Sequence, residues 1–344
     1  MHINKEFVRD GEIYPESFFE IENVTAFLPD YLDGIEERIE DMLVCLDGGE
    51  PDGELGRRCE TPRACPLTEE CWEDMPAHHV MTLCYGSALG ERLLRRGILA
   101  VSEIPDEEPL NGKQEIQREC VISGLPYYNR AEIRGFLKQL AYPLHFLDFE
   151  TFRFAIPVYN GTKPYQQIIF QFSLHVCARD GDGGTHYGYL ADGQNDPRPA
   201  LLRELRGRLG PAGSILAYNK SFEEERLNES AAAFPVEKGW IEGAVSRLLD
   251  LAAPFKGFLY YHPEQYGSWS QKKVLPALTG ISYNGLNIGD GETASLKYIE
   301  CNFGNLTEEA RAKIRNDLVA YCGQDTKGMM EMVRALRRIV QKKI

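Results

Sequence analysis

The sequence predicts an α/β protein in which a mixed central β-sheet is flanked by helices, preceded by a mainly helical, cysteine-containing region. Three observations predict this class. An apolar run over residues 142–151 ends in two carboxylates, strand and helix patterns alternate after it, and helical patterns with clustered cysteines come before it.

The run over residues 142–151 is typical of a central strand. Leu144, Phe146 and Phe149 are apolar and Pro143 bounds the run. Because alternate side chains of a strand share a face, Asp148 and Glu150 point the same way, about 7 Å apart along the backbone. Two like charges this close favour a cation between them, and hard oxygen ligands favour Mg²⁺ or Mn²⁺. The alternative is a strand end whose carboxylates face water.

The segments that follow predict the rest of the sheet and its helices. The glycine-rich stretch 180–184 is suited to a hairpin turn, and Gly323 and Gly328 are expected interruptions of the last helix. Strands are predicted at 167–178, 185–190 and 213–219, and helices at 196–209, 222–234 and from 307 onward.

The region before the opening strand predicts helices separated by polar loops, the last of them over residues 126–140. Two domains are expected for a chain of 344 residues. We place them at residues 1–135, a helical region with a cysteine cluster, and 136–344, the α/β domain.

Composition limits the classes of function. The formal charge of −14 argues against a general nucleic-acid coating protein, because phosphate neutralisation needs clustered Lys and Arg. It does not exclude an enzyme that holds one chain end. No apolar run approaches the ~20 residues of a membrane span, and residues 1–9 lack the layout of a signal peptide. We therefore expect a cytoplasmic protein without membrane contact.

Nine cysteines in a chain with no export signal argue against a disulfide framework. Cys59, Cys65 and Cys71 are separated by five residues each time, with turn-forming prolines between them. This spacing favours Zn²⁺ or an iron-sulfur cluster, with Cys45 or Cys84 as a fourth ligand. The alternative is three reduced thiols packed in a small helical module.

Carboxylates recur in three segments. Asp148 and Glu150 end the first strand, Glu223 follows the strand at 213–219, and Asp325 stands four residues after Tyr321, on one helical face. Together the three segments resemble the D-x-E, N-x-x-F-D and Y-x-x-x-D motifs of the DEDD (DnaQ-like) 3′-to-5′ exonucleases, of the DEDDy type, which have the ribonuclease H-like fold. Glu223 departs from the pattern, since Asp is usual there, and Glu224 is a rival assignment.

The resemblance, which covers roughly residues 140–335, implies two-metal hydrolysis of phosphodiester bonds at the 3′ end of single-stranded DNA or RNA. Two Mg²⁺ or Mn²⁺ ions would be bridged by Asp148 and completed by Glu150, Glu223 and Asp325, and Tyr321 would orient the attacking water. The alternatives are a solvated first-turn glutamate at 223 and an ordinary helix tyrosine at 321.

A narrower resemblance concerns residues 142–175, 196–198 and 267–276, which look like an uncharacterised bacterial domain-of-unknown-function family. In that family the exonuclease-like domain often follows a RecB-like nuclease domain with an iron-sulfur cluster, and the segment from Cys59 to Trp72 resembles the end of that cluster motif. The resemblance implies a 4Fe–4S cluster and a RecB-like nuclease partner. The 58 residues before Cys59 are too few for the RecB-like half, so we expect a fragment or a short form.

Candidate substrate-binding residues are Asn219, Lys272 and Lys273, although a lysine pair is commonly a solvated surface. The alternative function is a catalytically inactive nucleic-acid- or protein-binding module in a bacterial repair or defence complex, with Glu223 in place of Asp as a sign of lost metal binding. The oligomeric state is left open.

Overall fold

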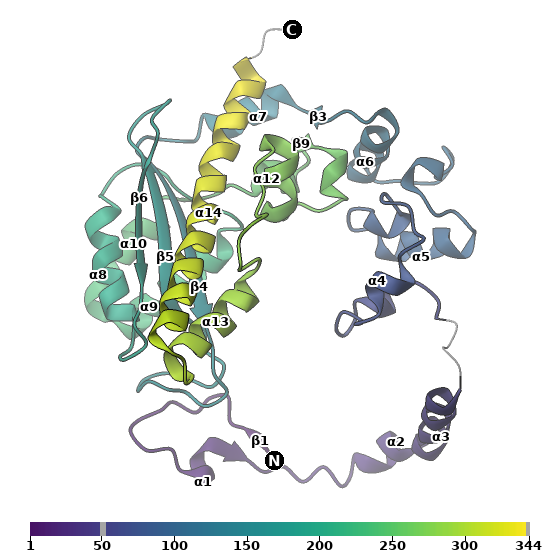
Figure 1. Ribbon diagram of the computed structural model, residues 1–344, viewed down its shortest axis with the longest axis horizontal. Coiled ribbons are helices and arrows are strands. Elements are labelled where there is room, and N and C mark those ends of the chain that lie inside the picture. The colour runs from purple at the N-terminus through teal and green to yellow at the C-terminus, as the bar shows by residue number, and fades with distance from the viewer. Residues whose placement is uncertain (49–52, 342–344) are drawn as a thin grey trace.

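A five-stranded mixed sheet forms the centre of the α/β part (Figure 1). The structure is a computed structural model that describes residues 1–48 and 53–341. The strands follow the order β6-β5-β4-β7-β8; β4, β5 and β6 are antiparallel neighbours, whereas β4, β7 and β8 run parallel. Their bounds are β4 (Leu144–Phe152), β5 (Ile168–Cys177), β6 (Thr185–Leu190), β7 (Ile215–Ala217) and β8 (Leu248–Asp250). The mixed central sheet and four of its strands were predicted, whereas β8 was not.

Helices cover both faces of this sheet. On one face α8, α9 and α10 pack on Leu147 and Phe149, and on the other α12, α13 and α14 pack over Phe146 and Phe152. The helices of this part are α7 (Arg130–Leu137), α8 (Arg198–Arg208), α9 (Ser221–Ala233), α10 (Lys238–Val245), α11 (Ala253–Lys256), α12 (Gln271–Thr279), α13 (Gly291–Phe303) and α14 (Glu308–Gln341). Because side chains alternate along β4, Asp148 and Glu150 share the face of Phe146, the face that α14 crosses (Figure 1).

The last helix, α14, is continuous, so the interruptions expected at Gly323 and Gly328 were wrong. Gly328 instead serves packing, since a Cβ there would lie 2.7 Å from the Cδ2 atom of Leu275 in α12. A glycine inside a helix costs about 1 kcal/mol relative to alanine. The close contact between α12 and α14 explains why glycine stands at this position despite that cost in helix stability.

The helix predicted over residues 126–140 is shorter than expected. Tyr127 and Tyr128 form a strand, β3 (Tyr127–Tyr128), that pairs antiparallel with β9 (Tyr260–Tyr261). Helix α7 begins only after Asn129, whose side chain accepts a hydrogen bond from the backbone N–H of Glu132. The tyrosines of β3 therefore follow their strand preference because a partner strand is available.

The region before β3 consists mainly of short helices. Its small core gathers Val80, Leu93 and Val101, and a second contact packs Cys84 and Cys120 on Phe258 and Tyr261. The bounds are β1 (His2–Ile3), α1 (Pro15–Phe18), β2 (Phe19–Glu20), α2 (Leu28–Leu32), α3 (Ile35–Asp47), η1 (Arg57–Cys59), α4 (Thr68–Cys71), η2 (Val80–Thr82), α5 (Ser87–Arg95), η3 (Val101–Glu103), α6 (Gly112–Ser123) and, later in the chain, η4 (Pro235–Glu237) and η5 (Pro263–Gln265).

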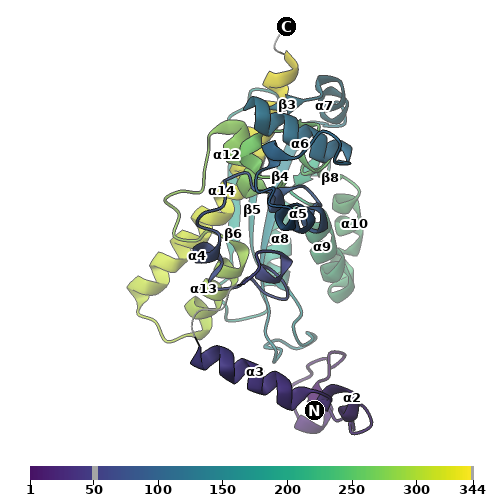
Figure 2. The same ribbon diagram turned by 90° about the vertical axis from the view of Figure 1, so that its right-hand side faces the viewer.

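Two parts of this region differ in how they meet the α/β part. The first residues are attached to it through the backbone, where Arg9 exchanges hydrogen bonds with Gly161 and Thr162. Helices α2 and α3 lie apart from the sheet in both views and contain no buried residue (Figures 1 and 2). The division at residue 135 stays a prediction. Within the described ranges no helix combines the length and apolar character that crossing a bilayer requires.

Candidate metal centre

Strand β4 and helix α14 bring three potential metal ligands together. An oxygen of Asp148, an oxygen of Glu150 and the sulfur of Cys322 all lie within 4.8 Å of one another. Across residues 1–48 and 53–341 no other group of three or more His, Cys, Asp or Glu side chains meets this criterion. The prediction that Asp148 and Glu150 point the same way is thus met by the geometry, and Cys322 joins them.

Hydrogen bonds to β5 fix the position of α14. The side-chain amide of Gln171 donates to the carbonyl oxygen of Leu318 over 2.9 Å. The Thr326 hydroxyl lies 2.7 Å from the Ser173 hydroxyl and 2.8 Å from Nδ1 of His175. These buried contacts flank the turn that carries Tyr321, Cys322 and Asp325 and direct it toward β4.

Asp325 is held by two residues that sequence reasoning missed. The Tyr283 hydroxyl donates a 2.5 Å hydrogen bond to Oδ1 of Asp325. The side-chain amide of Gln271 donates to the Tyr283 hydroxyl over 3.1 Å and to the Asp325 carbonyl oxygen over 2.8 Å. Tyr283 lies in the connection after α12, where no local pattern marks it, so only the packing of α12 against α14 reveals its role.

Glu223 lies in the first turn of α9, the helix that follows β7. Its side chain is 3% exposed, and one carboxylate oxygen, Oε2, is buried without a hydrogen-bond partner. Its neighbour Glu224 instead pairs with Lys220 over 3.1 Å in a partly exposed position. The geometry therefore favours Glu223 over Glu224 as the member of the site.

Asn219 shapes the turn between β7 and α9. Its backbone is left-handed, with φ of 62°, a conformation that Asn tolerates better than most residues. Its N–H donates to Oδ1 of Asp250 over 2.9 Å, and the same oxygen accepts the N–H of Ala252. Asn219 is thus seen in a turn that positions Glu223, while its predicted contact with substrate stays a prediction.

Burial and mutual repulsion disfavour the charged forms of these carboxylates. Burial raises the pKa of Asp148 well above its usual range, and the charges of Asp325, Glu150 and Glu223 raise it further. Burial, followed by the charge of Asp325, raises the pKa of Glu150 to about 8. Burial likewise raises the pKa of Glu223 to about 8, with the charge of Asp250 contributing. A bound cation would relieve this repulsion.

Asp325 differs because several neighbours favour its ionised form. Burial raises its pKa, and the hydrogen bond from Tyr283, the charge of Lys272 and the nearby Tyr321 hydroxyl limit the rise to about 6. Tyr321 itself is buried, and burial, followed by the charge of Asp325, raises the pKa of its hydroxyl. The hydroxyl therefore stays protonated at neutral pH and can donate a hydrogen bond.

The two candidate lysines have different neighbours in the structure. Lys272 lies beside the carboxylates, where its charge lowers the pKa of Glu150 and Asp325, and its Nζ is 5.6 Å from the ring centre of Tyr321. Lys273 lies 5.1 Å from the ring centre of Tyr266. Only Lys272 is thus brought to the site.

The four carboxylates suit a hard divalent cation such as Mg²⁺ or Mn²⁺, because they offer anionic oxygens, one of them buried without a partner. Cys322 adds a softer sulfur ligand to this set.

The structure does not assemble the four cysteines predicted to bind Zn²⁺ or an iron-sulfur cluster. Cys59 ends η1, Cys71 ends α4 and Cys65 lies between them, whereas Cys45 lies in α3 and is exposed. They do not form a group with ligand atoms within 4.8 Å of one another in the described part of the chain. Cys84 is buried beside Cys120. The cysteine site therefore stays a prediction from the sequence.

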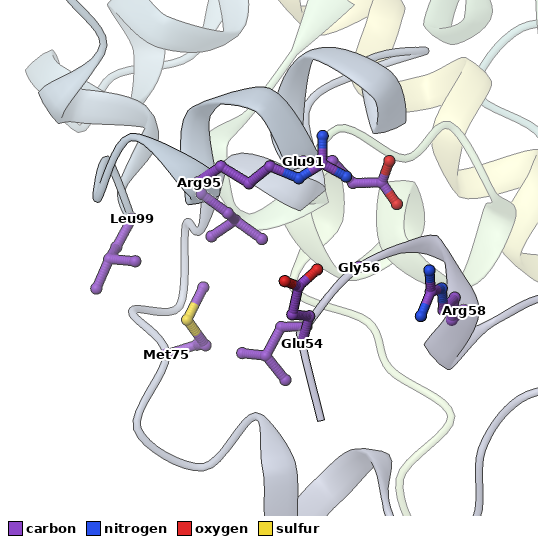
Figure 3. Close-up of a pocket in the computed structure, with 9 residues that line it drawn as sticks. Glu54, Gly56, Arg58, Met75, Glu91, Arg95 and Leu99 are labelled. Carbon is purple, nitrogen blue, oxygen red and sulfur yellow. The ribbon is translucent and has the colours of Figure 1, made fainter. Parts of the chain in front are cut away.

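A separate cavity of about 310 Å³ lies in the region before β3 (Figure 3). Glu54, Glu91, Arg95 and Leu99 are among the residues around it. None of the predicted site residues lines this cavity.

Comparison with known proteins matches part of the chain to a family. The family model described as a domain of unknown function (DUF2779) matches residues 145–270. This range contains Asp148, Glu150 and Glu223 but ends before Tyr321 and Asp325. The match agrees with the expected similarity to a domain-of-unknown-function family.

The curated relatives are uncharacterised proteins of mycoplasmas. The uncharacterised protein MG366 of Mycoplasma genitalium is 26% identical over 216 residues, which cover 57% of this chain and 32% of the relative. The uncharacterised protein UU173 of Ureaplasma parvum is 25% identical over 219 residues, covering 57% and 31%. The chain spans about a third of the length of these relatives. No solved structure gives a significant match.

Proposed function

We propose that the chain is a metal-dependent 3′-to-5′ exonuclease of the ribonuclease H-like, DEDDy type, acting on single-stranded DNA or RNA. The observation that carries the proposal is the burial of carboxylates from three distant segments within range of one another's charges. Asp148 and Glu150 come from β4, Glu223 from α9 and Asp325 from α14, and their charges act on one another. Such a buried acidic cluster is costly unless it binds cations.

The residues have distinct roles in this proposal. Asp148, Glu150, Glu223 and Asp325 would hold two Mg²⁺ or Mn²⁺ ions. Such ions would activate the attacking water and stabilise the leaving oxygen. The protonated hydroxyl of Tyr321 orients the attacking water. Lys272, beside the carboxylates, would contact a phosphate oxygen of the substrate.

The test is hydrolysis of a single-stranded oligonucleotide labelled at its 5′ end. With Mg²⁺ or Mn²⁺ we expect a ladder of products shortened from the 3′ end, abolished by a chelator. The same oligonucleotide labelled at its 3′ end should release the label as a mononucleotide from the first time point. Folded protein that shortens neither DNA nor RNA in either metal would contradict the proposal and favour the non-catalytic binding module.

Replacement of each of the two tyrosines near Asp325 should impair activity in a different way. Tyr321→Phe removes the hydroxyl that orients water, so kcat should fall roughly 10²-fold at saturating Mn²⁺. Tyr283→Phe removes a hydrogen bond that lowers the pKa of Asp325, so the protonated form competes with the cation at neutral pH. That variant should need more Mn²⁺ for half-maximal rate and should recover as the pH rises.

Measuring rate against Mn²⁺ concentration at two pH values separates these effects. The assignment of roles would be wrong if Tyr283→Phe lowered only the saturated rate, or if Tyr321→Phe changed only the Mn²⁺ requirement.

A further inference from the structure

Cys322 places a thiol inside the carboxylate site. Its side chain is 0% exposed, and its Sγ lies 3.4 Å from Oδ2 of Asp148 as a hydrogen-bond donor. The Sγ also belongs to the group of ligand atoms, with oxygens of Asp148 and Glu150, that lie within 4.8 Å of one another. The exonuclease proposal uses neither this thiol nor its position.

The distances fit a cation that binds both sulfur and oxygen. With Zn–S of about 2.3 Å and Zn–O of about 2.1 Å, two ligands of a tetrahedral ion lie about 3.6 Å apart. The separation of 3.4 Å between Cys322 Sγ and Asp148 Oδ2 is close to this value. An oxygen of Glu150 lies within 4.8 Å of both of these ligand atoms.

A buried carboxylate beside this group lacks a partner. Glu223 is 3% exposed, its Oε2 has no hydrogen-bond partner, and its charge acts on both Asp148 and Glu150. An unpaired buried carboxylate oxygen is costly, and ligation to a cation removes that cost. This observation is independent of Cys322 and adds a second buried group, near Asp148 and Glu150, that a cation would stabilise.

We propose that Asp148, Glu150 and Cys322 bind a thiophilic divalent cation of the Zn²⁺ class through two carboxylates and a thiolate. Binding releases the thiol proton to solvent as the metal–sulfur bond forms. Mg²⁺ and Mn²⁺ prefer oxygen and leave the thiol protonated. The functional consequence rests on the proposed exonuclease: a thiophilic cation occupies the same carboxylates and inhibits by excluding Mg²⁺.

Cd²⁺ is the probe, because a cadmium–thiolate bond gives an ultraviolet charge-transfer band that carboxylates do not give. The parent for the test is the full chain with Cys45, Cys59, Cys65 and Cys71 replaced by serine, which removes the accessible thiols. Titration with Cd²⁺ should produce the band in this parent and lose it in the additional Cys322→Ser variant. An equal band in both proteins, or no band in the parent, would overturn the proposal.

A second measurement requires no change at Cys322. Excess Mn²⁺ should suppress the Cd²⁺ band in the parent, because the two cations share Asp148 and Glu150. In the parent carrying Asp148→Asn, the band should appear only at higher Cd²⁺ concentration. A band that neither Mn²⁺ nor Asp148→Asn affects would show that cadmium binds elsewhere and would overturn the shared site.

The two proposals fail separately. If the protein shows exonuclease activity with Mg²⁺ but no Cys322-dependent band, the exonuclease proposal stands and the thiophilic site is refuted. If the protein shows a Cys322-dependent band but hydrolyses no nucleic acid, the metal-site proposal stands and the exonuclease proposal is refuted.

Discussion

Asp148→Asn should reduce the proposed exonuclease activity by at least roughly 10³-fold while making the metal-free protein more stable. Metal ions contribute several kcal/mol to phosphoryl chemistry, and each 1.36 kcal/mol corresponds to a tenfold change in rate. Asp148 is the residue on which the charges of Asp325, Glu150 and Glu223 all act. Replacing it with a neutral isostere removes a proposed metal ligand and relieves that repulsion.

Activity assays together with thermal unfolding at pH 8 in a chelator check this expectation. Glu224→Gln is the matched control, since Glu224 carries the same charge next to Glu223 but pairs with Lys220 instead. It should leave activity within about twofold of the parent chain, as is usual for surface substitutions. Full activity in Asp148→Asn would refute the proposed site, and unfolding of the variant would refute the role of repulsion.

The metal-free protein should lose stability as the pH rises from about 4.5 to about 8. The folded state raises the pKa of Glu150 and Glu223 from 4.5 to about 8. Between these values the folded protein binds more protons than the unfolded chain, so the free energy of unfolding falls with pH. Above about 8 the two glutamates are ionised in both states and this contribution becomes constant.

The expected effect is large enough to measure by thermal unfolding. One pKa unit corresponds to about 1.4 kcal/mol, and 1 kcal/mol shifts Tm by about 2–4 °C for a domain of this size. We therefore expect Tm to fall by at least about 5 °C between pH 5 and pH 8 in a chelator. Mn²⁺ should reverse most of the fall at pH 8, because it binds only the folded, ionised site.

The double variant Glu150→Gln, Glu223→Gln provides the comparison. It should show a flatter dependence of Tm on pH and little response to Mn²⁺. An equally steep dependence in the double variant would place the responsible titrating groups outside this site.

Local periodicity explains which features could be predicted. Strand β4 was predicted from its apolar run, and the shared face of Asp148 and Glu150 followed from the two-residue period of a strand. The shared face of Tyr321 and Asp325 followed from the 3.6-residue period of a helix in the same way. These inferences need only neighbours in the chain.

Cys322 lay within reach of the same reasoning but was missed. It is three residues before Asp325 and four after Leu318, so it lies on the buried face of α14. Its place beside the predicted carboxylates could have been inferred from helical spacing. The shortening of α7 was harder to predict from the sequence, because the pairing of Tyr127 and Tyr128 with β9 joins segments more than 100 residues apart.

By itself the sequence determined the central strand, the mixed sheet and the shared face of Asp148 and Glu150. Only the tertiary structure decided that Tyr283 and Gln271 hold Asp325, that Lys272 rather than Lys273 reaches the site, and that Cys322 joins Asp148 and Glu150. The physical reason is that strand and helix periods are set by local backbone geometry. Contacts between α12, α14 and β4 depend on how distant segments pack, which no local pattern encodes.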